Sequence, residues 1–394
     1  MNKKMLIIIL SCLVIALVIA VYAINAVQSN IIHIPDAKLV RILPDPVPNR
    51  YWVVDKFSGL ILLSQPQPPD GPWDWQKYPI GPVIDAAGPD SQGRLYCSFS
   101  DYKTIKGVHI FDCASASVID TIDLDYLPRA LALSSDEARL YVVAYGWPSF
   151  GQFPDESLAD MHPDSGLLLE IDIATKAVLR SAATGALPET VHYIKCGEVE
   201  RVLVGTGEGH TVSEPGEFGY ACGKSAPVDI FDISTLTRLE PRIYVQYGWS
   251  SYRNAMLDWT FNGCYVAICC YFPFRAPDRP EMDDAIWIID PVTNSVVDTF
   301  TIRDLEGNVV GAQSAIISSV HEDRVYVAMG MTHQATVNPG PWDRIYIIDP
   351  YSGETLDAID TEWQASVFIF EIPDGRLLVS CDKSGDILVL DPDN

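Results

Sequence analysis

The sequence has few cysteines and few basic residues for its length. Nine cysteines in 394 residues, one of them Cys12 within an N-terminal apolar stretch, are too sparse for a disulfide scaffold. No CxxC pair or Cys/His spacing resembles a zinc site. The 27 Lys and Arg residues face 52 Asp and Glu, a net charge of −25, and an acidic surface repels nucleic acid and anionic lipid. We therefore expect no zinc site and no nucleic-acid partner.

Motifs of common enzymes are also missing. The sequence contains no GxSxG, no HExxH and no visible Ser/His/Asp arrangement. The stretch "GTGEG" (205–209) imitates a nucleotide loop but lacks a βαβ context. Glu208, His210, Glu214 and Glu217 offer possible metal ligands, although a polar loop tip is the simpler interpretation. The sequence therefore assigns no metal and no cofactor, and it favours a binding protein over an enzyme.

The N-terminus carries the only helix that we expect. Lys3 and Lys4 precede an uncharged apolar run from Met5 to about Ala23, which nearly spans a bilayer core of about 30 Å and exceeds a signal-peptide core of ~7–15 residues. The lysines favour a cytoplasmic N-terminus. Residues 1–29 are thus predicted to be a membrane anchor and linker, with the rest extracellular or periplasmic. The alternative is a signal peptide cleaved after Ala23, which would give a secreted protein.

The remaining chain repeats one pattern. The stretch "DDAIWIIDPVTNSVVDTFTI" (283–302) has counterparts that start at residues 107, 166, 227 and 343, with a degenerate first copy at 59–67 and a truncated last one at 385–394. Each copy contains or approximates an apolar strand, an aspartate-containing turn and a second strand. A short β-branched and aromatic segment precedes each copy; examples are "RLYCSFS" (94–100), "RLYVVAY" (139–145) and "RVYVAMG" (324–330).

A third apolar stretch lies ahead of each of these segments, so one unit contains four strands, here called a to d. We count seven b-strands and predict an all-β fold, a seven-bladed β-propeller of four-stranded antiparallel blades over residues 30–394. The last blade lacks strand d, and we expect the segment "NIIHIP" (30–35) to supply it and to close the ring.

These units resemble the YVTN family within the WD40-like and quinoprotein-dehydrogenase-like propellers. The resemblance rests on "RLYVVAY", "RVYVAMG" and "IWIIDPVTNSVVDTFTI" and covers roughly residues 30–394. The b-strands lack the Thr-Asn that ends the family's namesake tetrapeptide, and no Trp-Asp ends strand c. The resemblance implies a seven-bladed propeller at a cell surface or outside the membrane, and it implies no particular chemistry.

Connections in such a blade alternate between two faces. We call the face with the b–c and d–a connections the top face, and the face with the a–b and c–d turns the bottom face. Bottom turns are short, whereas four successive b–c connections are long: 147–165, 208–226, 271–282 and 331–342. Long loops on a rigid scaffold often carry binding. Their candidate binding residues are His210, Arg275 and Trp342, unless the loops simply pack together as a cap.

The start of each inner strand a provides a second set of candidates. Aligned a-strands place Arg129, Glu189, Arg253, Gln313 and Gln364 at equivalent positions. We expect them at the top mouth of the central channel, where Arg and Gln could hold a polar or anionic ligand. A solvated rim with an Arg–Glu pair is the plainer alternative. His192 follows on the same strand as Glu189.

Two functions remain open. The favoured one is a membrane-anchored binding or scaffold module whose top face takes a protein or a small polar ligand. The alternative is a propeller enzyme of the lyase, lactonase or quinoprotein type, with Arg129, Glu189, His192 and Arg253 around one pocket. Cys97 and Cys113 bracket one hairpin, where either a disulfide or a reduced pair would fit.

Overall fold

A computed structural model gives the fold of the described residues, and all their regular elements are β-strands. Within this part of the chain, no helix has the length and hydropathy needed to cross a membrane. The predicted anchor, residues 1–29, lies outside it. The described residues are 31–67, 71–100, 105–145, 166–185, 188–206, 211–212, 220–221, 225–246, 256–261, 265–269, 285–308, 313–319, 321–329, 344–361, 366–381 and 385–393.

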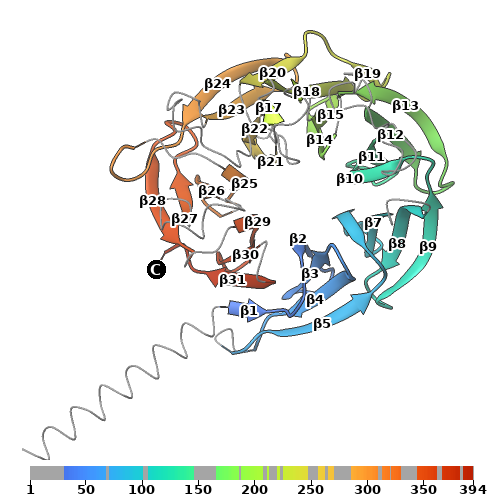
Figure 1. Ribbon diagram of the computed structural model, residues 1–394, viewed down its shortest axis with the longest axis horizontal. Helices are drawn as coiled ribbons and strands as arrows, with labels where there is room; N and C mark the ends of the chain where they lie inside the picture. Colours follow the sequence, from blue (N-terminus) through green and yellow to red (C-terminus); the bar gives the residue numbers. More distant parts are fainter. Residues whose placement is uncertain are drawn as a thin grey trace, which may run out of the picture.

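Seven antiparallel sheets stand around one axis like the blades of a propeller (Figure 1). Blade 1 consists of β2 (Leu39–Pro44), β3 (Arg50–Asp55), β4 (Gly59–Ser64) and β5 (Asp74–Pro79). Blade 2 consists of β6 (Val83–Ala87), β7 (Arg94–Ser100), β8 (Lys106–Asp112) and β9 (Ser117–Asp123). Blade 3 consists of β10 (Leu127–Leu133), β11 (Arg139–Tyr145), β12 (Gly166–Asp172) and β13 (Val178–Thr184). The predicted segments 94–100 and 139–145 are therefore strands β7 and β11.

Three further blades complete most of the ring. Blade 5 consists of β21 (Met256–Phe261), β22 (Tyr265–Cys269), β23 (Ala285–Asp290) and β24 (Ser295–Thr301). Blade 6 consists of β25 (Gln313–Ser318), β26 (Val325–Met329), β27 (Arg344–Ile348) and β28 (Thr355–Asp360). Blade 7 consists of β29 (Ser366–Glu371), β30 (Leu377–Cys381), β31 (Asp386–Leu390) and β1 (Ile31–His33). The predicted fold class, an all-β seven-bladed propeller, is confirmed.

Blade 4 departs from the simple four-stranded pattern. Its strands are β14 (Thr190–Cys196), β15 (Val199–Gly205), β18 (Ser225–Asp232), β19 (Thr237–Arg238) and β20 (Ile243–Gln246), and both β19 and β20 pair with β18. The outer strand is interrupted where Pro241 has no amide hydrogen to donate and where Arg242 reaches the buried carboxylate of Asp229, with Nε 2.6 Å from Oδ1. A separate hairpin, β16 (Thr211–Val212) with β17 (Tyr220–Ala221), lies within the b–c connection of this blade.

The two ends of the described chain meet in blade 7. Strand β1 pairs antiparallel with β31 through Ile31–Leu388, Ile32–Ile387 and His33–Asp386. His33 Nδ1 lies 2.6 Å from Asp386 Oδ1, and the buried side chains of Ile32 and Ile34 join the core between blades 7 and 1. Because β1 occupies the outer position of the blade, the first and last sheets of the ring are held together by residues distant in sequence.

The core lies between the blades. Strands that carry apolar residues on both faces bury each face against a neighbouring sheet. The described residues form one apolar cluster for each pair of adjacent blades. Their central residues are Tyr51 and Ile387 (blades 7 and 1), Trp52 and Leu95 (1 and 2), Tyr96 and Leu140 (2 and 3), Tyr141 and Val202 (3 and 4), Leu203 and Ile289 (4 and 5), Ile288 and Val325 (5 and 6), and Tyr326 and Ile369 (6 and 7). The ring is therefore stabilised by seven similar interfaces.

The turns of the bottom face repeat one arrangement. The aspartate that ends or follows strand c accepts a backbone amide two or three residues later in five blades, through Asp112, Asp172, Asp232, Asp290 and Asp349. The fourth residue after each aspartate has a positive φ; these residues are Ala116, Lys176, Leu236, Asn294 and Gly353. The aspartates thus shape the turns.

Candidate functional site

The inner strands of the seven blades surround the ring axis (Figure 1). Six of them, all except β14, show a register shift against their neighbouring strand b. A bulge of this kind bends the strand and redirects side chains, and it occurs often beside functional sites. Polar side chains near three of these bulges, together with Tyr145 of β11, His192 of β14 and Glu189 just before β14, form what we call the axial site. Its residues are Arg41, Asp85, Arg129, Tyr145, Glu189 and His192.

The upper part of the axial site joins blades 3 and 4. Arg129 Nε lies 3.1 Å from Glu189 Oε2, and Arg129 Nη2 donates to the same oxygen. The Tyr145 hydroxyl donates to the other carboxylate oxygen, Oε1, and the guanidinium carbon lies 5.2 Å from the centre of the Tyr145 ring. The Arg129 and Glu189 side chains are only 14% and 7% exposed. Both charges are thus held in fixed positions by several contacts.

A second ion pair joins the inner strands of blades 1 and 2. Arg41 Nη1 of β2 is 3.0 Å from both carboxylate oxygens of Asp85 on β6. Asp85 Oδ2 also accepts the backbone amide of Leu131 at 3.1 Å, so this one carboxylate links blades 1, 2 and 3. The Arg41 guanidinium carbon lies 6.0 Å from the centre of the Phe368 ring in blade 7. The pair therefore fixes the inner strands of four blades relative to one another.

His192 is the third residue of β14 and lies opposite Leu203 of β15. Blades 1 and 4 lie on opposite sides of the axis (Figure 1), yet the positive charge of Arg41 contributes to the electrostatics of the His192 ring. Desolvation by burial, together with the Arg41 charge, lowers the pKa of His192 to about 4. The imidazole is therefore neutral near pH 7, with one nitrogen that can donate and one that can accept a hydrogen bond.

The structure brings together two of the nine predicted binding residues. Arg129 and Glu189 form the ion pair, and His192 lies deeper on β14. Gln313 is the first residue of β25, but its side chain lies outside the described part of the structure. The other predicted residues fall outside the described residues altogether: Arg253, Gln364, His210, Arg275 and Trp342. The same is true of Glu208, Glu214 and Glu217.

Sequence reasoning missed Arg41, Asp85 and Tyr145. A signal was present in the sequence, because Arg41 and Asp85 stand at equivalent positions, opposite the fifth residue of the b-strand segments that begin at Arg50 and Arg94. The predicted ring was limited to the row that contains Arg129 and Glu189. Tyr145 was read simply as the last residue of a b-strand, and nothing in the sequence indicates that its hydroxyl reaches Glu189.

The two faces of the ring differ in the length of their connections. From the strand bounds, the b–c connections of blades 3 to 6 span residues 146–165, 206–224, 270–284 and 330–343, whereas bottom-face turns within blades contain two to nine residues. The long connections leave the sheets at the same face at which the inner strands begin. The predicted concentration of long connections on the top face of four successive blades agrees with these bounds.

Other reactive groups of the described residues do not form a second centre. Among these residues, no group of three or more His, Cys, Asp or Glu side chains is arranged to hold a metal ion. Cys97 and Cys113 are both buried free thiols, which answers the open question about a disulfide in favour of the reduced pair. Burial raises the pKa of both, that of Cys113 to about 12, so neither forms a thiolate readily.

Comparisons with known proteins identify the fold but no family. No protein-family model matches the chain, and the search of curated proteins finds no relative. Among solved structures, the chain is similar to Kuenenia stuttgartiensis hydrazine synthase, with a TM-score of 0.65, 14% sequence identity, and coverage of 91% of this chain and 97% of that chain. At this identity the likeness shows the β-propeller fold alone. The fold by itself implies no particular function, and a relationship to the YVTN family stays a prediction.

Proposed function

We propose that this protein is an exported, membrane-anchored β-propeller that binds a ligand or a partner protein through its top face, centred on the axial site. The observation that carries the proposal is the asymmetry of the ring. Four successive blades have long b–c connections on the face where the inner strands begin, while turns on the other face are short. A fold specified by repetition does not require these connections, and binding commonly resides in such loops.

The chemistry of the axial site supports a polar or anionic ligand group. Arg41 and Arg129 are each paired with a carboxylate, so their guanidinium groups are already oriented and lose little freedom when a ligand binds. His192 stays uncharged near neutral pH because its pKa is about 4, and it can both donate and accept a hydrogen bond. A carboxylate, a hydroxyl or a backbone carbonyl of a bound molecule would find partners here.

The binding proposal can be tested by removing one ion pair from each face. The full chain is purified from its native membranes in mild detergent, and co-purified proteins and small molecules are quantified by mass spectrometry. The top-face variant carries Arg129→Ser and Glu189→Ser. The matched bottom-face variant carries Arg201→Ser and Asp232→Ser, which removes an ion pair with an equally exposed guanidinium, 14% in both cases.

We expect at least one molecule to be retained by the natural protein and by the bottom-face variant, and to be depleted about tenfold or more with the top-face variant, as when a centrally placed pair at an interface is lost. Equal retention by all three proteins would contradict a top-face site. Unfolding curves of both variants show whether the loss reflects the site or the fold.

The membrane part of the proposal rests on sequence and topology. The apolar run after Lys3 and Lys4 is long enough to span a bilayer. Strand β1 is an outer strand d antiparallel to β31, so the chain enters the ring at the bottom face, and the top face would point away from the membrane. A cysteine introduced at Ser225, just after the blade 4 connection, should react with a membrane-impermeant biotin reagent on intact cells. Labelling only after lysis would contradict this orientation.

A further inference from the structure

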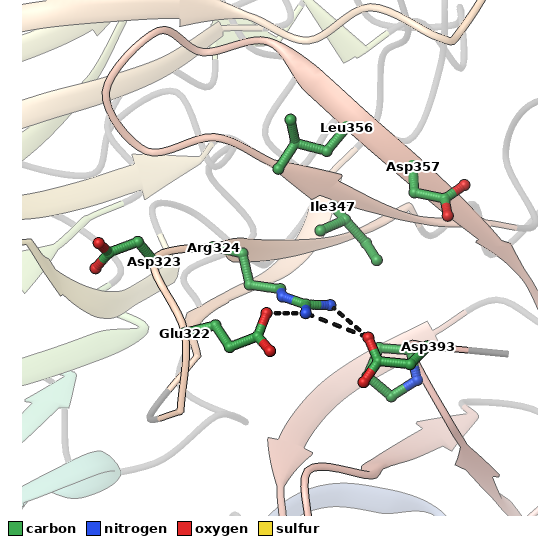
Figure 2. A pocket seen from close by; sticks show the side chains of 8 residues that line it. Glu322, Asp323, Arg324, Ile347, Leu356, Asp357 and Asp393 are labelled. Atoms are coloured by element: carbon green, nitrogen blue, oxygen red, sulfur yellow. Dashed lines mark hydrogen bonds and ion pairs between the residues drawn. The ribbon is translucent and has the colours of Figure 1, made fainter.

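A hollow lies on the bottom face, between blades 6 and 7 (Figure 2). It has a volume of about 470 Å³, within the roughly 300–1,000 Å³ typical of ligand pockets. Its walls come from the a–b turn of blade 6, from β27 and β28, and from the residues after β31. We call it the bottom pocket, and its lining residues are Glu322, Asp323, Arg324, Ile347, Leu356, Asp357, Pro392 and Asp393.

One cation of the bottom pocket is already neutralised. Arg324 donates to Glu322, and both of its terminal nitrogens lie 3.2 Å from Asp393 Oδ1. Two further carboxylates, Asp323 and Asp357, lie on opposite sides of Ile347 and Leu356 in Figure 2. Within the described part of the chain, neither has a cationic partner; Asp357 Oδ1 accepts only the backbone amide of Ala358, at 2.7 Å. The pocket thus combines an apolar floor with unbalanced negative charge.

The same position in another blade already holds a lysine. In blade 6 Asp357 faces Ile347 across the c–d pair, and in blade 2 Asp120 faces Ile110 in the same register. The neighbouring residue is an exposed aliphatic side chain in both, Leu356 at 52% and Ile119 at 55%. Lys176, from the c–d turn of the next blade, pairs through Nζ with Asp120. In blade 2, therefore, an aspartate beside an exposed aliphatic side chain holds a lysine ammonium.

At the junction of blades 6 and 7 the internal lysine is missing from the described residues. There the residues after β31 bring Pro392 and Asp393 to the pocket, and Asp393 is engaged with Arg324. A lysine stem packs well on apolar surface while its ammonium reaches a carboxylate at the rim. Charge and shape thus both suit a long, flexible cationic side chain.

We propose that the bottom pocket binds a lysine-bearing segment of a partner protein, with the lysine stem on Leu356 and its ammonium at Asp357. This site is separate from the axial site, because it lies on the opposite face and between different blades. It does not depend on the function proposed for the top face.

The experiment measures binding of two short capped peptides to the full chain in non-ionic detergent, by isothermal titration calorimetry at low salt. The probe is acetyl-Gly-Lys-Leu-Lys-Gly-amide, and the reference peptide replaces both lysines by norleucine. The variants are Asp357→Asn and Leu356→Ser. The matched control is Asp298→Asn, at the same register position of blade 5, where the carboxylate also accepts the next backbone amide at 2.7 Å.

We expect saturable binding of the lysine peptide and none of the norleucine peptide. Asp357→Asn should raise the dissociation constant about fivefold, which is the effect of losing one largely exposed ion pair. Leu356→Ser should raise it as well. Asp298→Asn should change it less than about twofold. The proposal is overturned if neither peptide saturates, if Asp357→Asn has no effect, or if both asparagine variants weaken binding equally, since that would indicate only general attraction to an acidic protein.

Discussion

Turns on the bottom face of the ring use one device in blade after blade, whereas connections on the top face differ from blade to blade. An aspartate accepts a turn amide in five blades, and the residue four positions later has a positive φ in each. The b–c connections, by contrast, range from the three residues between β3 and β4 to the long segment between β11 and β12.

This difference separates residues that specify the ring from residues that are free to serve a function. A carboxylate that satisfies turn amides stabilises the same turn wherever it is repeated. Hydrogen bonds from Ser115 hold the pKa of Asp112 below its usual range, and those from Thr175 do the same for Asp172. The axial site contains no such repeat, because its ion pairs join unlike residues from different blades.

If bottom-face carboxylates specify the ring, their replacement should cause the largest losses of stability. Asp90, in the a–b turn of blade 2, is buried and accepts Arg94 Nε at 2.7 Å and the Tyr96 hydroxyl at 2.8 Å. Asp90→Ala should lower the free energy of unfolding by about 3 kcal/mol, because the partly buried guanidinium of Arg94 and the buried phenol of Tyr96 lose their partner. Urea unfolding tests this. The exposed Asp123, replaced by Ala, serves as the control, and an equal loss there would break the comparison.

His192 should impose a pH dependence that originates at the axis. Its pKa is about 4 in the folded protein against 6.5 in the unfolded chain, so between these values only the unfolded state binds the proton. Stability should therefore fall as the pH decreases from 6.5 to 4, by on the order of 2–3 kcal/mol. His192→Gln should remove this slope, while replacement of the exposed His321 by Gln should not. An unchanged slope in His192→Gln would place the titration elsewhere.

The upper ion pair should show a moderate coupling energy. Arg129 and Glu189 are largely buried and share Tyr145 as a neighbour. A double-mutant cycle with Arg129→Ala and Glu189→Ala should give a coupling of about 1–2 kcal/mol in the free energy of unfolding. A value near zero would mean that the pair is a solvated rim and does not hold fixed charges.

The smallest expected effect concerns the positive-φ residue of the bottom turns. Gly353 occupies this position in blade 6, whereas Ala116 does so in blade 2 with φ 49°. A side chain at positive φ costs about 1–2 kcal/mol, and glycine loses about 0.5–1 kcal/mol through greater freedom of the unfolded chain. Ala116→Gly should therefore raise the free energy of unfolding by roughly 0.5 kcal/mol. A decrease in thermal or urea unfolding would show that the turn is not strained there.

Repetition made the fold readable from sequence. The b-strand segments 94–100 and 139–145 coincide with β7 and β11 because each begins after a turn and continues as a run of residues that are buried on both faces of the sheet. The outer strand of blade 4 was less readable, since its break depends on Arg242 reaching Asp229, a contact formed only after folding. The row alignment predicted that Arg129 and Glu189 lie close together. It could not show that Asp85 is joined to Arg41 of blade 1 and to the backbone of blade 3, because those contacts also form only after folding.

We propose that the top face binds a ligand or a partner and that the turns of the bottom face specify the ring. The most direct test is an experimental structure of the full chain purified from native membranes in mild detergent. We expect density that does not belong to the chain at the top end of the axis, in contact with Arg129, His192 or the long b–c connections. Bound material confined to the bottom face or to the outer strands, with none at the axis, would contradict it.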